Sequence, residues 1–539
     1  MRLIRPINYP CVRYHDFFLI KSFTLTSTCS RHKFPILSEF LYYVCNWNIM
    51  VEMTGREGSM RIFEIMLLVG NVMLWIVDRW FRRKAVGVAG CLAIGIALFH
   101  FIFEGYRWQM VPLYALTAGY LLYLFVKTRR NKERSKQPHS IRSFLLPFLL
   151  AVSAILPILL PVFKIDSPSG PYSVGTVTYH WTDPSREEIL TDTPNDRREL
   201  LVQLWYPAQI DHASAKALYI PEYRQFGLAL QQEYKIPAFI FHYLRYIKTN
   251  SYVVSPLSAE QVQYPLIVFS HGLPGTRFTS TSQMEELASN GYLVAAIQHP
   301  YYAMTTVFPD QRIAPKTNKL PAVIDIDGWD RMIDVWVKDA QFVLDQFEKL
   351  NKQDPQGLLT GKINVDKIGM LGHSFGGAAT IQTLYADQRL KAGINMDGTP
   401  FGKTIVNGLK QPFMQMKTEV LETNTDVEPT EQQLAKIGVT KQAYDKYKTE
   451  IPIRNRVLFG NGGGYAVTIR GIKHMSFTDY YLWSPGLRLM DGLKLPPMQA
   501  RHIINSYVLA FFDKYLNQKA STILDEPIPP FNEVTIEKK

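Results

Sequence analysis

Long apolar stretches crowd the first third of the chain, and they constrain its fold more than any other feature. They cover roughly residues 62–77, 85–103, 110–126 and 143–163. Each is close to the ~20 residues that a helix needs to cross a hydrocarbon core. The first stretch contains Glu64 and Asn71, and the last contains prolines, which bilayer helices tolerate better than soluble ones. Because four such stretches follow one another between charged loops, they predict an all-α transmembrane region over residues 60–163.

The loops between these stretches differ in charge. Residues 78–84 and 127–142 are rich in Lys and Arg, whereas the intervening loop, 104–109, is nearly neutral. Short cytoplasmic loops collect Lys and Arg. The sequence therefore predicts a multi-pass protein of the cell membrane, with the domain that follows Phe163 on the extracytoplasmic side.

Residues 1–59 fit neither a signal peptide nor a membrane span. They lack the basic start, apolar middle and small-residue cleavage site of a secretory leader. One interpretation is an N-terminal extension. The other is that translation starts at Met60, because residues 55–58 can be encoded by a purine-rich run like a bacterial ribosome-binding site.

Charge and cysteine content narrow the classes of function. The net charge is +12, but many of the basic residues lie in the short loops between apolar stretches, where membrane topology explains them. No groove-reading motif accompanies them, so we expect no nucleic-acid partner. The four cysteines are Cys11, Cys29, Cys45 and Cys91. The part of the chain after residue 163 therefore has no disulfide, thiol nucleophile or cysteine metal site.

Residues 164–539 alternate between short apolar runs and helical patterns. The apolar runs lie at 264–270, 293–298, 367–371 and 392–396, and the helical patterns at 282–290, 329–350 and 377–385. Short apolar runs that end in small or polar residues are typical of buried parallel strands. The alternation predicts an α/β domain with a mostly parallel sheet and helices on both faces.

The borders of this domain carry weaker patterns. Residues 177–181 and 200–206 resemble strands of an antiparallel edge, and 411–416 and 466–469 are candidates for the last strands. Residues 497–515 predict a closing helix, and the polar stretch 418–452 predicts an insertion. We expect the tail after Lys519 to be loosely ordered.

The strongest local motif is G-x-S-x-G at residues 372–376, placed between a predicted strand and a predicted helix. A serine hydroxyl is a weak nucleophile, so it must be presented to a base and to the substrate carbonyl. A sharp strand-to-helix turn presents it in this way. Gly372 and Gly376 are required because side chains there would collide across the turn. The motif predicts Ser374 as the nucleophile.

Two further residues complete a catalytic triad in this interpretation. Asp397 ends the strand after the serine turn, and a carboxylate there lies on the same edge of a parallel sheet as Ser374. His474 follows the last predicted strand. The order serine, aspartate, histidine is that of the α/β-hydrolase fold. Three other acids, Asp325, Asp327 and Asp479, lie in different contexts. Three other histidines near strand ends, His271, His299 and His373, are interpreted as packing or supporting residues. His502 lies on a helix and is interpreted as an ordinary helix residue.

An oxyanion hole needs two backbone N–H donors. One is expected at Phe375, directly after the nucleophile. The other is expected at Leu273, because Gly272 frees the turn and Pro274 has no N–H to donate. No zinc, calcium or phosphate-binding motif occurs in the sequence, so we expect neither a metal nor a cofactor.

With these residues in place, residues 175–512 resemble the platelet-activating-factor acetylhydrolase family of serine esterases. The resemblance rests on motifs at 264–272, 293–299, 372–377, 396–398 and 474–479. It implies the same assignments, with Ser374, Asp397 and His474 as the triad and Leu273 and Phe375 as the oxyanion donors. It also implies calcium-independent hydrolysis of phospholipids with short or oxidised sn-2 acyl chains, although bacterial relatives are more like general carboxylesterases.

The chain departs from this family in its membrane region, since the animal enzymes lack four spans. The departure leaves open the nature of the substrate and the number of subunits in the protein. The aromatic stretch 236–247 has two interpretations. It is a surface lip that contacts the bilayer or the acyl chain of a substrate, or it is a core helix under the catalytic face.

Two other functions stay open at this point. One is a membrane-bound serine peptidase or amidase on the same scaffold, although no acidic pair for a substrate amino group is evident. The other is an envelope scaffold with an inactive hydrolase domain, which the intact triad order disfavours. We do not expect a transporter, because the spans lack the paired buried charges of an ion pathway.

Overall fold

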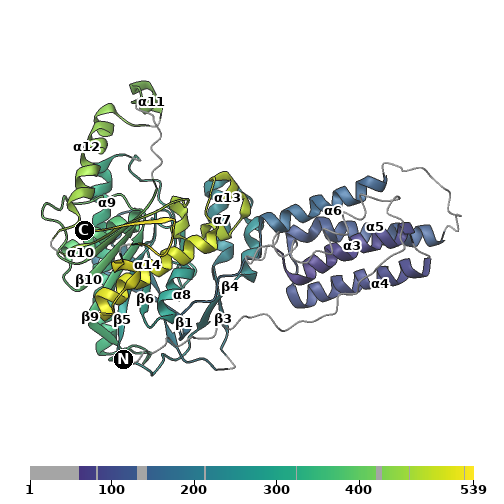
Figure 1. The fold of residues 1–539 in the computed structure, drawn as a ribbon, viewed down its shortest axis with the longest axis horizontal. Coiled ribbons are helices and arrows are strands. Elements are labelled where there is room, and N and C mark those ends of the chain that lie inside the picture. The colour runs from purple at the N-terminus through teal and green to yellow at the C-terminus, as the bar shows by residue number, and fades with distance from the viewer. Residues whose placement is uncertain are drawn as a thin grey trace, which may run out of the picture. The chain divides into compact units, whose positions relative to one another are not determined.

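A computed structural model covers the chain (Figure 1). It describes residues 60–80, 83–129, 142–211, 214–322, 324–419, 428–436, 438–460, 462–526 and 528–539. These described residues belong to one compact unit. The predicted extension, 1–59, lies outside the described residues.

Each of the four apolar stretches contains a helix. They are α3 (Ile62–Trp80), α4 (Arg83–Phe99), α5 (Val111–Arg129) and α6 (Arg142–Leu159), with short helical turns η1 (His100–Glu104) and η2 (Trp108–Met110) between α4 and α5. Two segments, Lys84–Glu104 and Trp108–Lys127, are long and apolar enough to cross a membrane. They carry exposed side chains such as Leu92, Leu98 and Leu122. Two helices of this kind are weak evidence for membrane association, and four spans remain a prediction.

A buried charge pair joins the first apolar helix to the loop between α4 and α5. The side chains of Glu64 and Arg107 are both 0% exposed, and Arg107 donates to the Glu64 carboxylate at 2.8 Å. Arg61 also donates to this carboxylate, at 2.8 Å. Because Arg107 lies between the two candidate spans and in neither of them, the pair does not contradict the expectation that the spans themselves lack paired buried charges. The sequence pattern missed the pair because Arg107 lies in the loop between α4 and α5, outside the apolar stretches.

The rest of the chain is built on one large mixed sheet. Its strands are β1 (Ser173–Glu187), β2 (Arg197–Ala208), β3 (Lys216–Leu218), β4 (Lys248–Val253), β5 (Tyr264–Ser270), β6 (Leu293–Gln298), β9 (Ile363–His373), β10 (Leu390–Met396), β11 (Phe413–Thr418), β12 (Gly464–Ile469) and β13 (Val534–Lys538). They form an 11-stranded sheet in the order β13-β12-β11-β10-β9-β5-β6-β2-β1-β4-β3. The run from β12 to β6 is parallel. This confirms the predicted mostly parallel sheet, and the antiparallel pairing of β1 with β2 confirms the predicted edge.

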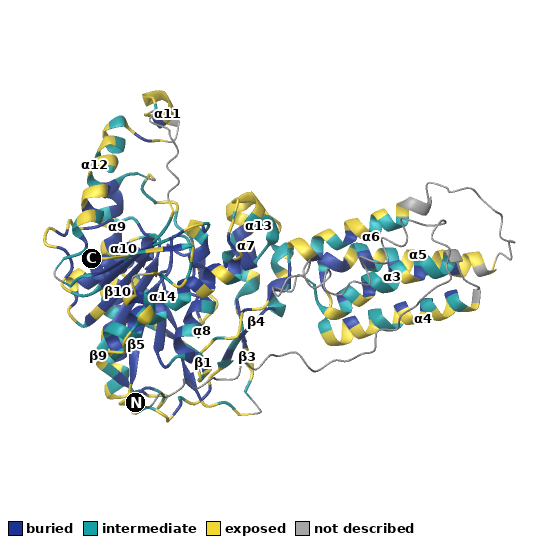
Figure 2. Cartoon of the chain, in the orientation of Figure 1, coloured by how far each residue is buried: buried dark blue, intermediate teal, exposed yellow. Residues whose placement is uncertain are grey.

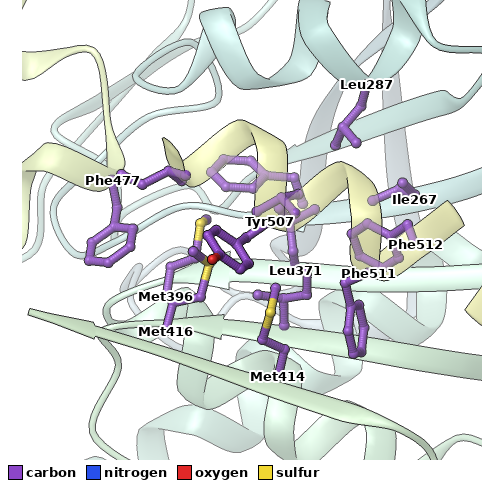
Figure 3. Packing of buried hydrophobic residues seen from close by; sticks show 14 of the residues in the cluster. Ile267, Leu287, Leu371, Met396, Met414, Met416, Phe477, Tyr507, Phe511 and Phe512 are labelled. Atoms are coloured by element: carbon purple, nitrogen blue, oxygen red, sulfur yellow. The ribbon is translucent and has the colours of Figure 1, made fainter. Parts of the chain in front are cut away.

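Helices cover both faces of the sheet. Successive side chains of a strand point to opposite sides, so a strand of apolar residues has two apolar faces to bury. On β11, Met414 and Met416 pack with Phe512 of α14 (Pro497–Asn517), and Figure 3 shows this cluster with α14 lying across the strands. Phe413 packs in the opposite cluster, which includes residues of α9 (Ile326–Lys352) and α10 (Phe375–Ala386). The strands are accordingly mostly buried (Figure 2).

Smaller elements connect and flank the sheet. They are α7 (Tyr223–Tyr234), η3 (Ala238–Tyr246), α8 (Thr281–Ser289), β7 (Thr305–Val307), β8 (Ile313–Pro315), α11 (Glu431–Lys436), α12 (Lys441–Val457), η4 (His474–Phe477), η5 (Tyr480–Leu482), α13 (Pro485–Met490) and α15 (Thr522–Asp525). The helices α11 and α12 occupy the predicted insertion between β11 and β12.

The tail after Lys519 is ordered by the sheet, so the expectation of a loose tail is wrong. Its last strand, β13, pairs antiparallel with β12. Val534 is only 6% exposed, and Asp525 accepts a hydrogen bond from the Tyr465 hydroxyl at 2.8 Å. The polar composition of the tail concealed these contacts, because an edge strand buries only one side.

Candidate active site

The predicted serine turn has the required geometry. β9 ends at His373, α10 begins at Phe375, and Ser374 between them has φ 54° and ψ −121°. A Cβ on Gly372 would lie 2.0 Å from the Gly376 carbonyl oxygen, and one on Gly376 would lie 2.1 Å from the Ser270 oxygen. These approaches leave no space for a side chain, so both glycines are needed for the turn to form.

Asp397 lies beside this turn. The Ser374 N–H donates to the Met396 carbonyl at 2.9 Å, which places the residue after β10 next to the serine. Asp397 itself has φ 57°. The Asn395 side chain holds the turn, because its amide nitrogen donates to the Gly398 carbonyl and its oxygen accepts from the Gly398 N–H, both at 2.8 Å.

The structure brings the predicted base to the predicted acid. Nδ1 of His474 lies 2.8 Å from Oδ2 of Asp397, and the Thr418 N–H donates to Oδ1 of Asp397 at 3.2 Å. Burial raises the pKa of Asp397, but the hydrogen bond and charge of His474 outweigh it and leave this pKa below its ordinary value. Asp397 is therefore a carboxylate at neutral pH, and it orients the His474 ring.

The Ser374 hydroxyl makes no hydrogen bond to His474 in the described part of the chain. Serine–histidine contacts are often loose in a free enzyme and tighten when substrate binds. The His474 side chain is 45% exposed, so the imidazole is accessible to a substrate.

His373, which the sequence predicted as a packing or supporting residue, is a neighbour of the base. Its ring centroid lies 4.5 Å from that of His474, and its Nε2 lies 3.0 Å from the His474 carbonyl oxygen. Burial, then the nearby His474 charge, lowers the pKa of His373 to about 3. It is therefore neutral at pH 7 and fixes the backbone of the base. In the G-x-S-x-G motif, His373 is only the variable residue before Ser374, so the motif itself does not predict this contact.

Two backbone amides are available for an oxyanion. Neither the Leu273 N–H nor the Phe375 N–H donates a hydrogen bond to another described residue. The loop that carries Leu273 lies close to the nucleophile, since a Cβ on Gly272 would lie 3.1 Å from the Ser374 Cβ. This is the arrangement expected of an oxyanion hole.

A buried polar network lies behind that loop. His299 contacts the Ser270 hydroxyl through Nε2 at 3.0 Å and the Asp339 carboxylate through Nδ1 at 2.8 Å. Arg198 donates to Asp339 at 2.6 Å. The His299 N–H donates to His271 at 3.3 Å. Both histidines are thus supporting residues at the strand ends, as the sequence predicted.

The competing acids lie in other places. Asp325 caps α9 by accepting from the Gly328 N–H at 3.0 Å, and Asp327 pairs with Lys446. Asp479 is buried and accepts from the Ser282 side chain and N–H. None of the three is hydrogen-bonded to His474 within the described residues.

One set of side chains has metal-ligand types. The ligand atoms of Glu64, His100 and Glu104 lie within 4.8 Å of one another in the helical region. All three already bind protein partners: Arg61 and Arg107 for Glu64, Tyr114 for His100, and the Phe63 N–H for Glu104. A metal ion would have to displace these contacts.

Comparison with known proteins agrees with this geometry. The family described as platelet-activating factor acetylhydrolase, isoform II, matches residues 160–353 and 345–523. A platelet-activating factor acetylhydrolase of Cavia porcellus is 26% identical over 378 residues, which are 65% of this chain and 78% of that protein. A probable 1-alkyl-2-acetylglycerophosphocholine esterase of Arthroderma benhamiae is 28% identical over 284 residues, 49% of this chain and 68% of that protein.

A solved structure extends the comparison to the fold. A ferulic acid esterase from Streptomyces cinnamoneus has a TM-score of 0.54 and 26% identity, and the match covers 69% of this chain and 98% of that one. The mostly parallel sheet is consistent with an α/β-hydrolase, and the chain is a carboxylic ester hydrolase. The resemblance drawn from the motifs is confirmed: this chain belongs to the platelet-activating factor acetylhydrolase, isoform II, family.

Proposed function

We propose that Ser374, His474 and Asp397 form the catalytic triad of this esterase. His474 takes the proton of the Ser374 hydroxyl as that oxygen attacks the acyl carbon, and Asp397 holds the imidazole in the right tautomer. The amides of Leu273 and Phe375 stabilise the oxyanion. His474 then gives that proton to the departing alcohol oxygen as the ester bond breaks, which leaves the acyl group on Ser374. A water molecule that His474 deprotonates attacks the acyl carbon, the acid is released, and the proton returns to the Ser374 oxygen. The observation that carries this proposal is the 2.8 Å contact of His474 with Asp397 beside the strained Ser374.

The substrate class follows from the relatives. Their names specify platelet-activating factor and 1-alkyl-2-acetylglycerophosphocholine, which are phospholipids with a short sn-2 acyl chain. We propose that this chain hydrolyses the sn-2 ester of such phospholipids. Hydrolysis rates over phosphatidylcholines of graded sn-2 length should fall steeply as the chain lengthens. A preference for long acyl chains would contradict this assignment.

The replacement Ser374→Ala tests the nucleophile. It should remove p-nitrophenyl acetate hydrolysis and labelling by a fluorophosphonate probe, because the probe modifies only an activated serine. His502→Ala, at an exposed position of α14, is the matched control and should leave both unchanged. Near-normal hydrolysis or labelling by the Ser374 variant would exclude the proposed triad.

The helical region, 60–163, is proposed to anchor a catalytic domain, 164–539, outside the cytoplasm. The exposed apolar faces of α4 and α5 and the basic loops support this topology. A reporter enzyme fused after residue 165 should be active when the reporter works only outside the cytoplasm. Activity of a cytoplasm-specific reporter at the same position would refute the orientation.

A further inference from the structure

A cavity of about 190 Å³ lies where the loop between α4 and α5 meets η3. Its lining includes Tyr106, Trp108, Gln109, Phe239, Arg245 and Tyr246. No carboxylate is among the residues that line it. The cavity is outside the proposed triad, and the esterase chemistry does not use it.

Gln109 gives the cavity an unsatisfied polar group. The residue is 0% exposed, and neither its side-chain nitrogen nor its oxygen has a hydrogen-bond partner. A buried amide without partners is destabilising, because it has lost its hydrogen bonds to water and gained none from the protein. The side chain therefore needs one acceptor and one donor from a bound molecule, whichever way the amide is turned.

Arg245 supplies an uncompensated positive charge. It donates to the Tyr246 hydroxyl at 2.6 Å and to the Tyr106 carbonyl at 3.1 Å, and it has no carboxylate partner in the described part of the chain. Its guanidinium carbon lies 4.7 Å from the centre of the Tyr246 ring. An anion is the group that this cation lacks, and guanidinium binds phosphate oxygens well.

The remaining walls of the cavity are aromatic. Trp108 donates to the Ile240 carbonyl at 3.1 Å and packs against Phe239 with ring centroids 5.2 Å apart. The faces of such rings attract an ammonium group. A ligand with a phosphate at one end and an ammonium at the other therefore satisfies Arg245, both atoms of Gln109 and the aromatic walls together.

The position of the loop indicates where this ligand comes from. Residues 105–107 join the two segments that are able to cross a membrane, Lys84–Glu104 and Trp108–Lys127. A loop between two spans lies at the level of the lipid headgroups, where Tyr and Trp are enriched. This step rests on the proposed membrane anchoring and is independent of the triad. The same step places η3, which lies within the aromatic stretch 236–247, at the membrane surface as well as against the core.

We propose that this cavity binds the phosphoethanolamine headgroup of a resident phospholipid, distinct from the substrate. The phosphate pairs with Arg245 and accepts from the Gln109 amide nitrogen, and the ammonium donates to the Gln109 oxygen and lies against the rings. The bound lipid links the α4–α5 loop to η3 and thereby fixes the catalytic domain at the bilayer surface.

Native mass spectrometry of the full-length protein tests this proposal. The detergent-solubilised protein is incubated with phosphatidylethanolamine, with phosphatidylcholine of the same chains, or with free O-phosphoethanolamine. We expect one retained phosphatidylethanolamine per chain and weaker retention of phosphatidylcholine, whose choline cannot donate to Gln109. Equal retention of the two lipids would overturn the headgroup assignment, and binding of free O-phosphoethanolamine without lipid binding would overturn the lipid source.

Variants localise the site. Gln109→Leu and Arg245→Gln should each lower retention of phosphatidylethanolamine by about tenfold or more, as expected for losing a hydrogen bond to a charged group. Arg197→Gln, at an exposed position of β2, is the matched control and should not change it. Hydrolysis of p-nitrophenyl acetate should persist in all three, which separates this outcome from a failure of the proposed esterase site. Unchanged retention in both cavity variants would overturn the site, and the wild-type lipid comparison decides the headgroup even if a variant fails to fold.

Discussion

Asp397 and Ser374 both have positive φ values, 57° and 54°, in a conformation that residues with a Cβ seldom adopt. The two residues follow adjacent strands, and the Ser374 N–H is bonded to the residue before Asp397. The surrounding glycines and the Asn395 side chain hold these conformations. Strain of this kind persists only where neighbours enforce it, and it is concentrated at functional sites.

The role of the Asp397 carboxylate can be tested by a replacement that removes its charge and keeps its size. Asp397→Asn keeps the size of the side chain but stabilises the wrong tautomer of His474, so kcat should fall by about 10³–10⁴-fold. Ester hydrolysis and thermal unfolding of the variant should be measured together. Asp327→Asn, which changes an exposed carboxylate, is the control and should retain normal kcat. A decrease of less than about tenfold in the Asp397 variant would rule out its triad role.

Glu285 predicts a pH dependence of stability. Burial raises its pKa from 4.5 to about 7, although the Ser251 hydroxyl and the Asn250 amide donate to it. Because the folded state holds the proton more tightly than the unfolded state, this contribution to stability is complete below about pH 4.5 and is lost as pH rises through 7. The loss is at most about 3 kcal/mol.

The replacement Glu285→Gln removes this titration. The melting temperature of the wild type should fall between pH 5 and pH 8 by more than that of the variant, and differential scanning fluorimetry over this range measures the difference. Parallel curves for the two proteins would show that Glu285 does not titrate in this range.

The residues of the proposed triad could be selected from the sequence because each follows a predicted strand in a recognisable motif, and the structure pairs Asp397 with His474. The sequence did not predict the contact of His373 with the base, nor the Thr418 N–H that donates to Asp397. Such contacts depend on the register of β9, β10 and β11, which no local motif records. The partnership of Glu64 with Arg107 was missed because 43 residues separate them and Arg107 lies in a loop outside the apolar stretches.

At the level of elements, the predicted strands agree with the observed ones where the observed strand is buried. The predicted runs 264–270 and 293–298 coincide with β5 and β6, in which every residue is buried. The strands β3, β4 and β13 were not predicted, because they are short and alternate between buried and exposed residues. An apolar run identifies a central strand, whereas an edge strand is defined by its neighbour.

The packing of α14 on the sheet predicts a large loss of stability for one truncation. Phe512 is 0% exposed and lies over Gly369 of β9, where a Cβ would approach its ring to 2.6 Å. Phe512→Ala should lower the free energy of unfolding by about 3–5 kcal/mol. Urea denaturation followed by tryptophan fluorescence measures it, with His502→Ala on the exposed side of the same helix as control. Equal midpoints for the two variants would contradict this packing.

At the level of the whole molecule, two proposals concern separate regions. The residues of the triad lie between 374 and 474, whereas the candidate spans end before residue 164. The compact sheet and its two helical layers include none of α3 to α6. Catalysis and anchoring should therefore be separable.

A fragment of residues 164–539 tests this separation. It should be recovered in the soluble fraction and should hydrolyse p-nitrophenyl acetate with a kcat within about threefold of the full-length protein, because no triad residue contacts the helical region. Fractionation by ultracentrifugation and the esterase assay give the two values. A folded fragment that sediments with membranes, or that is inactive, would argue against the division.

The strand order also determines when the protein gains its activity during synthesis. Ser374 is made about a hundred residues before His474 and Asp397 about eighty residues before it, and β12, the strand that precedes His474, is paired with β13 close to Lys539. A ribosome that has completed the nucleophile has thus not yet made its base. If the proposed triad is correct, the nascent polypeptide should therefore have no esterase activity until most of the sheet has been synthesised.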